Sequence, residues 1–166
     1  MLPFDPVAEA RRHWEEHGWH DAAPGMAAVT SIMRAQQIVL HRVEQVLRPL
    51  GLTFARYELL MLLVFSRSGA LPVSTASARL QVHPTSVGNA VDRLAAAGLV
   101  ERRPHPTDGR AVLVALTDDG RALALQATDL LNERVFCDIG LSERRTGSLV
   151  GAITDLRRAA GDFSAS

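Results

Sequence analysis

Apolar residues recur every three or four positions along most of the chain, the spacing that places them on one face of an α-helix. The longest such run covers residues 26–47 and stops at Pro49 and Gly51. Shorter helices are predicted over residues 6–19, 54–65, 73–80, 84–97, 118–137 and 143–160. The pattern therefore predicts a mainly α protein.

Residues at the helix starts support these bounds. Thr53 and Thr117 are suited to the N-cap, because a hydroxyl accepts a hydrogen bond from a free backbone N–H. Pro72 and Pro84 suit a first helical turn. Only the three residues 81–83 separate two of the short helices, which predicts a helix-turn-helix.

Alternating apolar and polar residues follow the second of these short helices. Residues 99–103 and 111–117 read as two strands, and residues 104–109 between them are rich in turn formers. A small β-hairpin is therefore predicted directly after the helix-turn-helix.

Composition adds a globular class to this picture. The chain has 166 residues, 47% of them hydrophobic, and zero formal net charge, so any electrostatic signal must come from charge placement. The single cysteine, Cys137, cannot form an intrachain disulfide, and no leader sequence is apparent. The apolar run at residues 59–65 is too short to span a membrane, so we expect a cytoplasmic protein.

The helix over residues 84–97 has two distinct faces. Its apolar face, expected to pack inward, comprises Val87, Ala90, Val91 and Leu94. Its opposite face carries small or polar residues, namely Thr85, Ser86, Gly88, Asn89 and Arg93. Such a surface suits a recognition helix in a major groove, although an ordinary solvated face has the same composition.

Basic residues gather on the hairpin. Arg102, Arg103 and Arg110 surround a turn that also holds His105. Residues 79–110 contain five arginines against three acidic residues, a local excess of two positive charges. The hairpin therefore suits a phosphate backbone, or a charged turn on a protein-interaction module.

The segment RLQVHPTSVGNAVDRLAAAGLVERRPHPTDGRAVLVALTDDGRAL, residues 79–123, resembles the turn, recognition helix and wing of MarR-family regulators. The similarity extends over about residues 26–160 and implies a winged helix-turn-helix homodimer. Residues 26–52 and 118–166 would form the dimer helices, residues 53–117 the DNA-binding lobe, and residues 1–25 an appended helical arm. We expect a repressor that binds a pseudo-palindromic double-stranded operator, with an activator as the alternative.

The resemblance also implies positions for the DNA contacts. Carried over by position, these are Pro84, Thr85, Ser86, Asn89 and Arg93 on the recognition helix and Arg110 on the wing, with Arg102, Arg103 and His105 nearby. Asp108 would brace Arg110, since a carboxylate beside phosphates is repelled unless it is paired. Gln81, at a turn position that is often Gly, and Gly88, inside a helix, depart from the usual helix-turn-helix pattern.

The family places an effector site between the dimer helices and the DNA-binding lobe. Residues predicted to line it are Trp14, Arg34, Gln37, His41, Tyr57, Glu58 and Met61, with Phe65 as a further aromatic wall. The expected effector is an aromatic or anionic metabolite that releases the protein from DNA. Each of these residues is more often part of the core than a ligand contact.

Other classes of function have weaker support in the sequence. Phosphate-loop, nucleophile-elbow and zinc-protease motifs are absent, so no enzyme, cofactor or bound metal is expected. His13, His17 and His20 leave a metal-sensing regulator open, against a solvated arm. Cys137 is a candidate redox switch but is better explained as a small buried residue.

Overall fold

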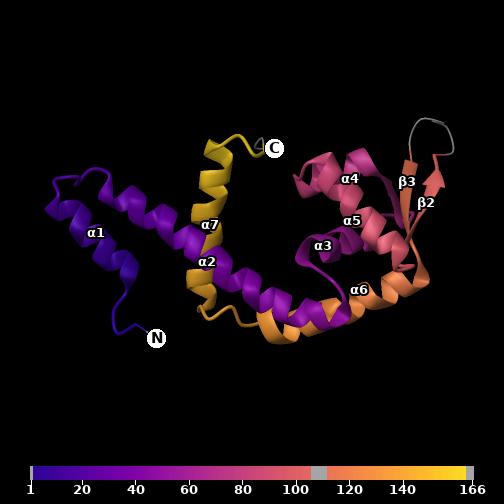
Figure 1. Ribbon diagram of the computed structural model, residues 1–166, viewed down its shortest axis with the longest axis horizontal. Coiled ribbons are helices and arrows are strands. Elements are labelled where there is room, and N and C mark those ends of the chain that lie inside the picture. Colours follow the sequence, from indigo (N-terminus) through magenta and orange to yellow (C-terminus); the bar gives the residue numbers. More distant parts are fainter. Residues whose placement is uncertain (1, 106–111, 164–166) are drawn as a thin grey trace. The chain divides into compact units, whose positions relative to one another are not determined.

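The computed structural model describes residues 2–105 and 112–163 (Figure 1). The chain divides into two compact units, Met1–Leu130 and Leu131–Ser166. Helix makes up 69% of the structure and accompanies a small three-stranded antiparallel sheet, which confirms the predicted fold class. Among the described residues, no helix is long and apolar enough to cross a membrane.

The first unit begins with the helical hairpin of α1 (Pro6–Glu16) and α2 (Ala23–Leu47). Asp5 caps α1, its carboxylate accepting from the Val7 N–H at 2.9 Å. The long helix, predicted to begin at residue 26, begins earlier, because α2 starts at Ala23 with Pro24 in its first turn. Proline fits there because the first turn leaves its backbone nitrogens without helical acceptors.

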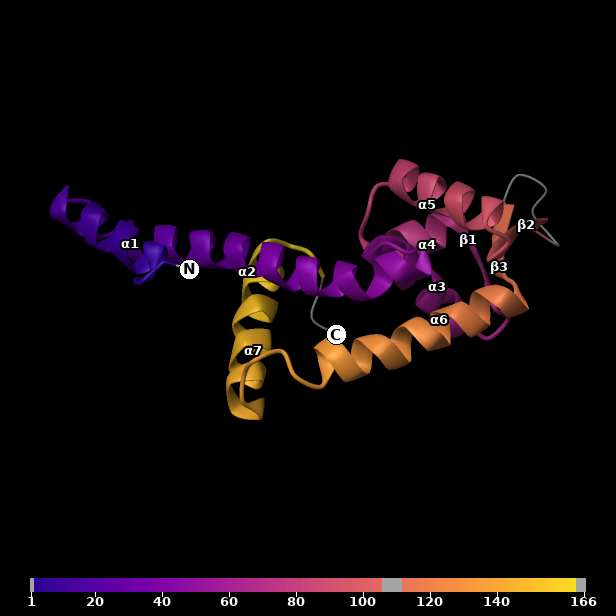
Figure 2. The ribbon, with the colours of Figure 1, turned by 60° about the horizontal axis from the view of Figure 1, so that its bottom comes forward.

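Three short helices follow the 3-10 turn η1 (Arg48–Leu50). They are α3 (Phe54–Val64), α4 (Val73–Leu80) and α5 (Pro84–Ala96). α4 and α5 contact each other and both contact α3 (Figure 2). This arrangement confirms the predicted helix-turn-helix.

The turn between α4 and α5 depends on Gln81, which has a φ of 54°. A left-handed backbone is costly for a residue with a Cβ atom, which is why glycine is common at this position. Two hydrogen bonds between Ser77 and Val82 hold the turn: the Ser77 Oγ donates to the Val82 carbonyl at 2.6 Å, and the Val82 N–H donates to the Ser77 carbonyl at 3.3 Å.

The sheet has the strand order β1-β3-β2, with β1 at Ala70–Pro72, β2 at Val100–Pro104 and β3 at Val112–Leu116. Both β1 and β2 pair with β3 in antiparallel register. β2 and β3 confirm the predicted hairpin, hereafter the wing. β1 is absent from the sequence prediction.

Helix α6 (Asp118–Leu131) leaves the wing and starts against its base. The Thr117 hydroxyl caps this start by accepting from the Gly120 N–H at 3.0 Å, as predicted. Helix α3 contributes Leu59, Leu60 and Leu63 to the core, and each is fully buried. Phe65, expected in this apolar run, is instead 78% exposed, because it lies past the last turn of α3.

The second unit contains a π-helical turn (Asn132–Phe136) and helix α7 (Glu143–Ala159). The predicted continuous α-helix to Cys137 is therefore wrong in its last turn. A π-turn inserts an extra residue and rotates the positions that follow it. Cys137 is exposed in the single chain, so the prediction that it is buried is wrong there.

Candidate DNA interface

Helix α5 is amphipathic in the sense that the sequence predicts. Val87, Val91 and Leu94 are at most 2% exposed and pack into the lobe. Its polar residues Thr85, Ser86, Asn89 and Arg93 are exposed. One face of α5 thus anchors the helix in the core, which leaves the polar face free to meet a partner.

The N-terminus of α5 is ordered by local hydrogen bonds. His83 precedes the helix, and its Nδ1 accepts from the Thr85 N–H at 3.2 Å. Pro84 occupies the first turn. Thr85 and Ser86 are therefore held at the exposed start of the helix, where the helix dipole favours negatively charged partners.

The described wing arginines are engaged in ion pairs. The Arg102 Nη2 lies 2.5 Å from a carboxylate oxygen of Asp92 on α5, and Arg103 pairs with Glu101 on its own strand. Their charges are partly compensated within the chain, which sequence reasoning did not foresee. His105 is half-buried at the end of the described strand, while Asp108 and Arg110 lie outside the described residues.

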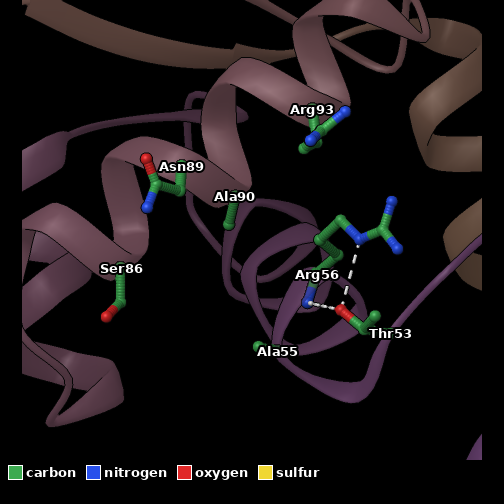
Figure 3. A pocket seen from close by; sticks show the side chains of 7 residues that line it. All are labelled: Thr53, Ala55, Arg56, Ser86, Asn89, Ala90 and Arg93. Carbon is green, nitrogen blue, oxygen red and sulfur yellow. Dashed lines mark hydrogen bonds between the residues drawn. The ribbon is translucent and has the colours of Figure 1, made fainter.

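An open pocket of about 410 Å³ separates α5 from the start of α3 (Figure 3). The residues that line it are Thr53, Ala55, Arg56, Ser86, Asn89, Ala90 and Arg93. The Thr53 Oγ1 accepts from the backbone N–H of Arg56 at 3.4 Å and from its Nε at 3.2 Å. Sequence reasoning missed Arg56, although the Thr53 cap signalled that this residue follows in the first turn.

The seven residues predicted to line an effector site lie in different settings. Tyr57 and Met61 are buried in α3 and reach Thr128 of α6: the Tyr57 and Thr128 hydroxyl oxygens are 3.0 Å apart, and the Thr128 Oγ1 lies 3.2 Å from the Met61 sulfur. Glu58 lines an apolar pocket of about 50 Å³ with α5, and partial burial raises the pKa of its carboxyl. None of these three residues lines the larger pocket beside α5.

The other four predicted effector residues lie on α1 and α2. Arg34 and Gln37 form a hydrogen bond with each other at 3.5 Å, and His41 lies 3.0 Å from the side-chain nitrogen of Gln45. The Trp14 ring packs edge-on against Trp19, with their centroids 5.2 Å apart. The effector site remains a prediction.

Two of the three histidines of the arm, His13 and His17, have protein partners nearby. His13 lies 3.1 Å from Glu16, and the Nδ1 of His17 lies 2.7 Å from the His13 carbonyl. The His17 ring stacks on Trp19. Within residues 2–105 and 112–163, no group of three or more histidine, cysteine or acidic side chains is arranged to hold a metal.

Both the sequence and the fold match those of known proteins. Residues 50–111 match the sequence model of the MarR family. Sco5413, a MarR family transcriptional regulator from Streptomyces coelicolor, is 51% identical and superposes with a TM-score of 0.78, covering 86% of this chain and 99% of its own. The chain belongs to the MarR family.

Two further solved structures bear on the site, the first of them a MarR family regulator. Sco3205 from Streptomyces coelicolor, solved in complex with DNA, is 26% identical over 84% of this chain and 87% of its own, with a TM-score of 0.69. BpsR from Bordetella bronchiseptica, whose DNA binding is regulated by 6-hydroxynicotinic acid, is 25% identical over 76% of this chain and 90% of its own, with the same TM-score of 0.69.

Membership of the MarR family identifies the chain as a DNA-binding transcriptional regulator, a class distinct from enzymes. In this MarR family member, α4 and α5 form the helix-turn-helix, and β2 and β3 form the wing. The exposed polar face of α5 is therefore the candidate DNA interface.

Proposed function

We propose that this MarR family protein is a homodimeric repressor whose two copies of α5 enter successive major grooves of a pseudo-palindromic operator. The observation that carries the proposal is the division of α5 into a buried apolar face and an exposed polar one. Asn89 can pair with the edge of an adenine, while Thr85 and Ser86 supply hydroxyls and Arg93 a guanidinium. Pro84 fixes the start of this helix.

Exposed apolar side chains on helices α2 and α7 support the homodimer. Every residue of α2 from 31 to 41 is exposed, including Ile32, Met33, Ile38, Val39 and Leu40. Helix α7 has no buried residue and exposes Leu149, Val150 and Leu156. Apolar surface of this extent is characteristic of an interface, and a second copy would bring the two-fold symmetry that a pseudo-palindrome mirrors.

The wing would contact DNA beside the groove that α5 occupies. We assign Arg110 to the minor groove with Asp108 as its brace, and Arg102, Arg103 and His105 to the adjacent backbone. The local excess of positive charge over residues 79–110 supports this assignment. Such a regulator would act in the cytoplasm, where it meets double-stranded DNA.

A small-molecule effector would release the dimer from DNA. Regulation of BpsR by 6-hydroxynicotinic acid supports an aromatic, anionic metabolite as the ligand class. Its site would be lined by the residues predicted above, from Trp14 on α1 to Met61 on α3. Release requires only that the ligand bind more tightly to the dimer conformation that fits DNA poorly.

Selection of binding sequences from a random DNA pool, at two salt concentrations, tests the proposal. We expect a palindrome with half-site centres about 10 base pairs apart and weaker binding at high salt, because phosphate contacts release counterions. Sedimentation of the complex should give two protomers per duplex. A DNA affinity that depends neither on salt concentration nor on DNA sequence would instead support a winged-helix module that binds protein partners.

Repression is tested separately from binding. A reporter gene placed behind the selected sequence should be expressed less when the wild-type protein is present, and the Arg110→Ala variant should relieve this effect. Higher expression with the wild-type protein would identify an activator and overturn the repressor assignment.

A further inference from the structure

Two arginines of the DNA-binding lobe that form no ion pair within the described residues, Arg56 and Arg93, line the pocket between α3 and α5. The guanidinium of Arg93, from α5, has no ion-pair or hydrogen-bond partner among the described residues. Arg56, from α3, has only Thr53 as its side-chain partner there, through its Nε. Arg102 and Arg103 on the wing, by contrast, already pair with carboxylates.

The chemistry of the pocket suits an anionic oxygen group. Its seven described lining residues include two guanidinium groups, two hydroxyls and the Asn89 amide, and none is acidic. Figure 3 shows Arg56 and Arg93 at the same end of the pocket, with Asn89 and Ser86 further along α5. Glu44 lines a neighbouring pocket that Arg56 also borders, but Arg48 lies there too and offsets its charge.

The contact with Thr53 fixes the orientation of Arg56. Because Nε donates to the Thr53 hydroxyl, the two terminal nitrogens of the guanidinium stay available for a further acceptor. Planar, forked donors of this kind bind phosphate oxygens well. An arginine held in advance also loses less side-chain entropy on binding.

We propose that Arg56 and Arg93 clamp a DNA backbone phosphate in the pocket between α3 and α5, at the border of the groove that α5 reads. This inference rests on the proposed function, because it requires the polar face of α5 to meet DNA. It adds a contact from α3, a helix outside the helix-turn-helix and the wing. Such a contact fixes the register of α5 without reading sequence.

Salt-dependent binding of the full-length protein to a labelled random-sequence duplex tests the clamp. Arg56→Gln and Arg93→Gln are compared with Arg67→Gln, a control of equal charge change. Arg67 is exposed beyond the opposite end of α3, near the base of the wing, where the Gly69 carbonyl accepts from the Leu116 N–H. Binding is measured by fluorescence anisotropy between about 50 and 200 mM salt.

Affinity falls as salt rises, and each pocket variant should make this dependence shallower. The slope of log affinity against log salt should shrink in magnitude by about 2 per dimer, which is about 0.9 for each lost phosphate contact. Across this fourfold salt range, the wild-type protein should therefore lose about twelvefold more affinity than the variant. Arg67→Gln should keep the wild-type slope. Arg56→Lys should retain most of the slope, because it keeps the charge, and so separates loss of contact from loss of fold.

Two results would overturn the clamp while leaving DNA binding intact. One is a wild-type slope in Arg56→Gln, whatever the slope of Arg93→Gln, because Arg93 also belongs to the polar face of α5. The other is a pocket variant that keeps the wild-type slope but is no longer stabilised against heat by inorganic phosphate as the wild-type protein is. That result would identify a site for a free anion. Wild-type protein that binds no duplex at any salt concentration would instead refute the proposed function, and the clamp with it.

Discussion

Substitution of Gly120 by alanine should disrupt the joint between the wing and helix α6. Gly120 is buried in the first turn of α6. A Cβ atom added there would lie 1.9 Å from the Leu99 carbonyl oxygen and 3.0 Å from a methyl carbon of Leu116. The first contact is with backbone, so a side-chain rotation cannot relieve it.

Relief of this clash must move α6 away from Leu99, and that movement breaks local hydrogen bonds. The Thr117 N–H donates to the Leu99 carbonyl at 3.2 Å, and the Thr117 hydroxyl donates to the Gly98 carbonyl at 2.8 Å. Two such bonds contribute about 1 kcal/mol each, and overpacking adds about 1–3 kcal/mol. Alanine regains about 1 kcal/mol through its helix propensity, which leaves a net loss of about 2–4 kcal/mol.

Urea denaturation at a fixed protomer concentration measures this loss, since the stability of the proposed homodimer would depend on concentration. Gly88→Ala in α5 is the matched control, because a Cβ at Gly88 has no described heavy atom within 4 Å. That variant should gain about 1 kcal/mol. A Gly120→Ala protein within about 0.5 kcal/mol of wild type would refute the packing argument.

Three further predictions concern charge and exposure. Burial raises the pKa of the Glu58 carboxyl, so its ionisation above that pKa lowers the stability of the folded protein. Glu58→Gln should therefore be more stable than wild type at pH 7. The two free energies of unfolding should converge below about pH 4, where Glu58 is protonated in both the folded and the unfolded protein. An advantage that persists at low pH would contradict this cause. Asp92→Asn should raise affinity for random-sequence DNA and steepen its salt dependence, because it frees Arg102; unchanged anisotropy titrations would show that this pair does not restrain the wing. Phe65→Ser should change the free energy of unfolding by less than about 0.5 kcal/mol, whereas Leu63→Ala should cost about 2–5 kcal/mol, and equal losses in urea would refute the exposure of Phe65.

The elements predicted correctly from sequence are those whose ends are marked by proline or capping residues. The bounds of α4 are those predicted, and α5 ends one residue early, because Pro72 and Pro84 mark the starts and the turn is short. The cap at Thr53 likewise fixed the start of α3. Proline and capping residues act on their nearest neighbours, so their effect is readable without tertiary structure.

Features that depend on contacts between elements were not predictable in this way. Strand β1 has only three residues, one of them proline, and owes its pairing to β3. The Asp92–Arg102 pair joins α5 to β2. Arg56 becomes part of the candidate interface only because α3 packs beside α5. Periodicity gives the face of a helix but not the identity of its neighbour.

The account depends most on base reading by α5, and selection of DNA sequences with wild-type and Asn89→Ala proteins tests this directly. Asn89 is exposed on that face, so its loss should change the preferred base at one position in each half-site and leave the spacing of the half-sites intact. Identical selected sequences for both proteins would contradict the assignment of α5 as the helix that reads DNA.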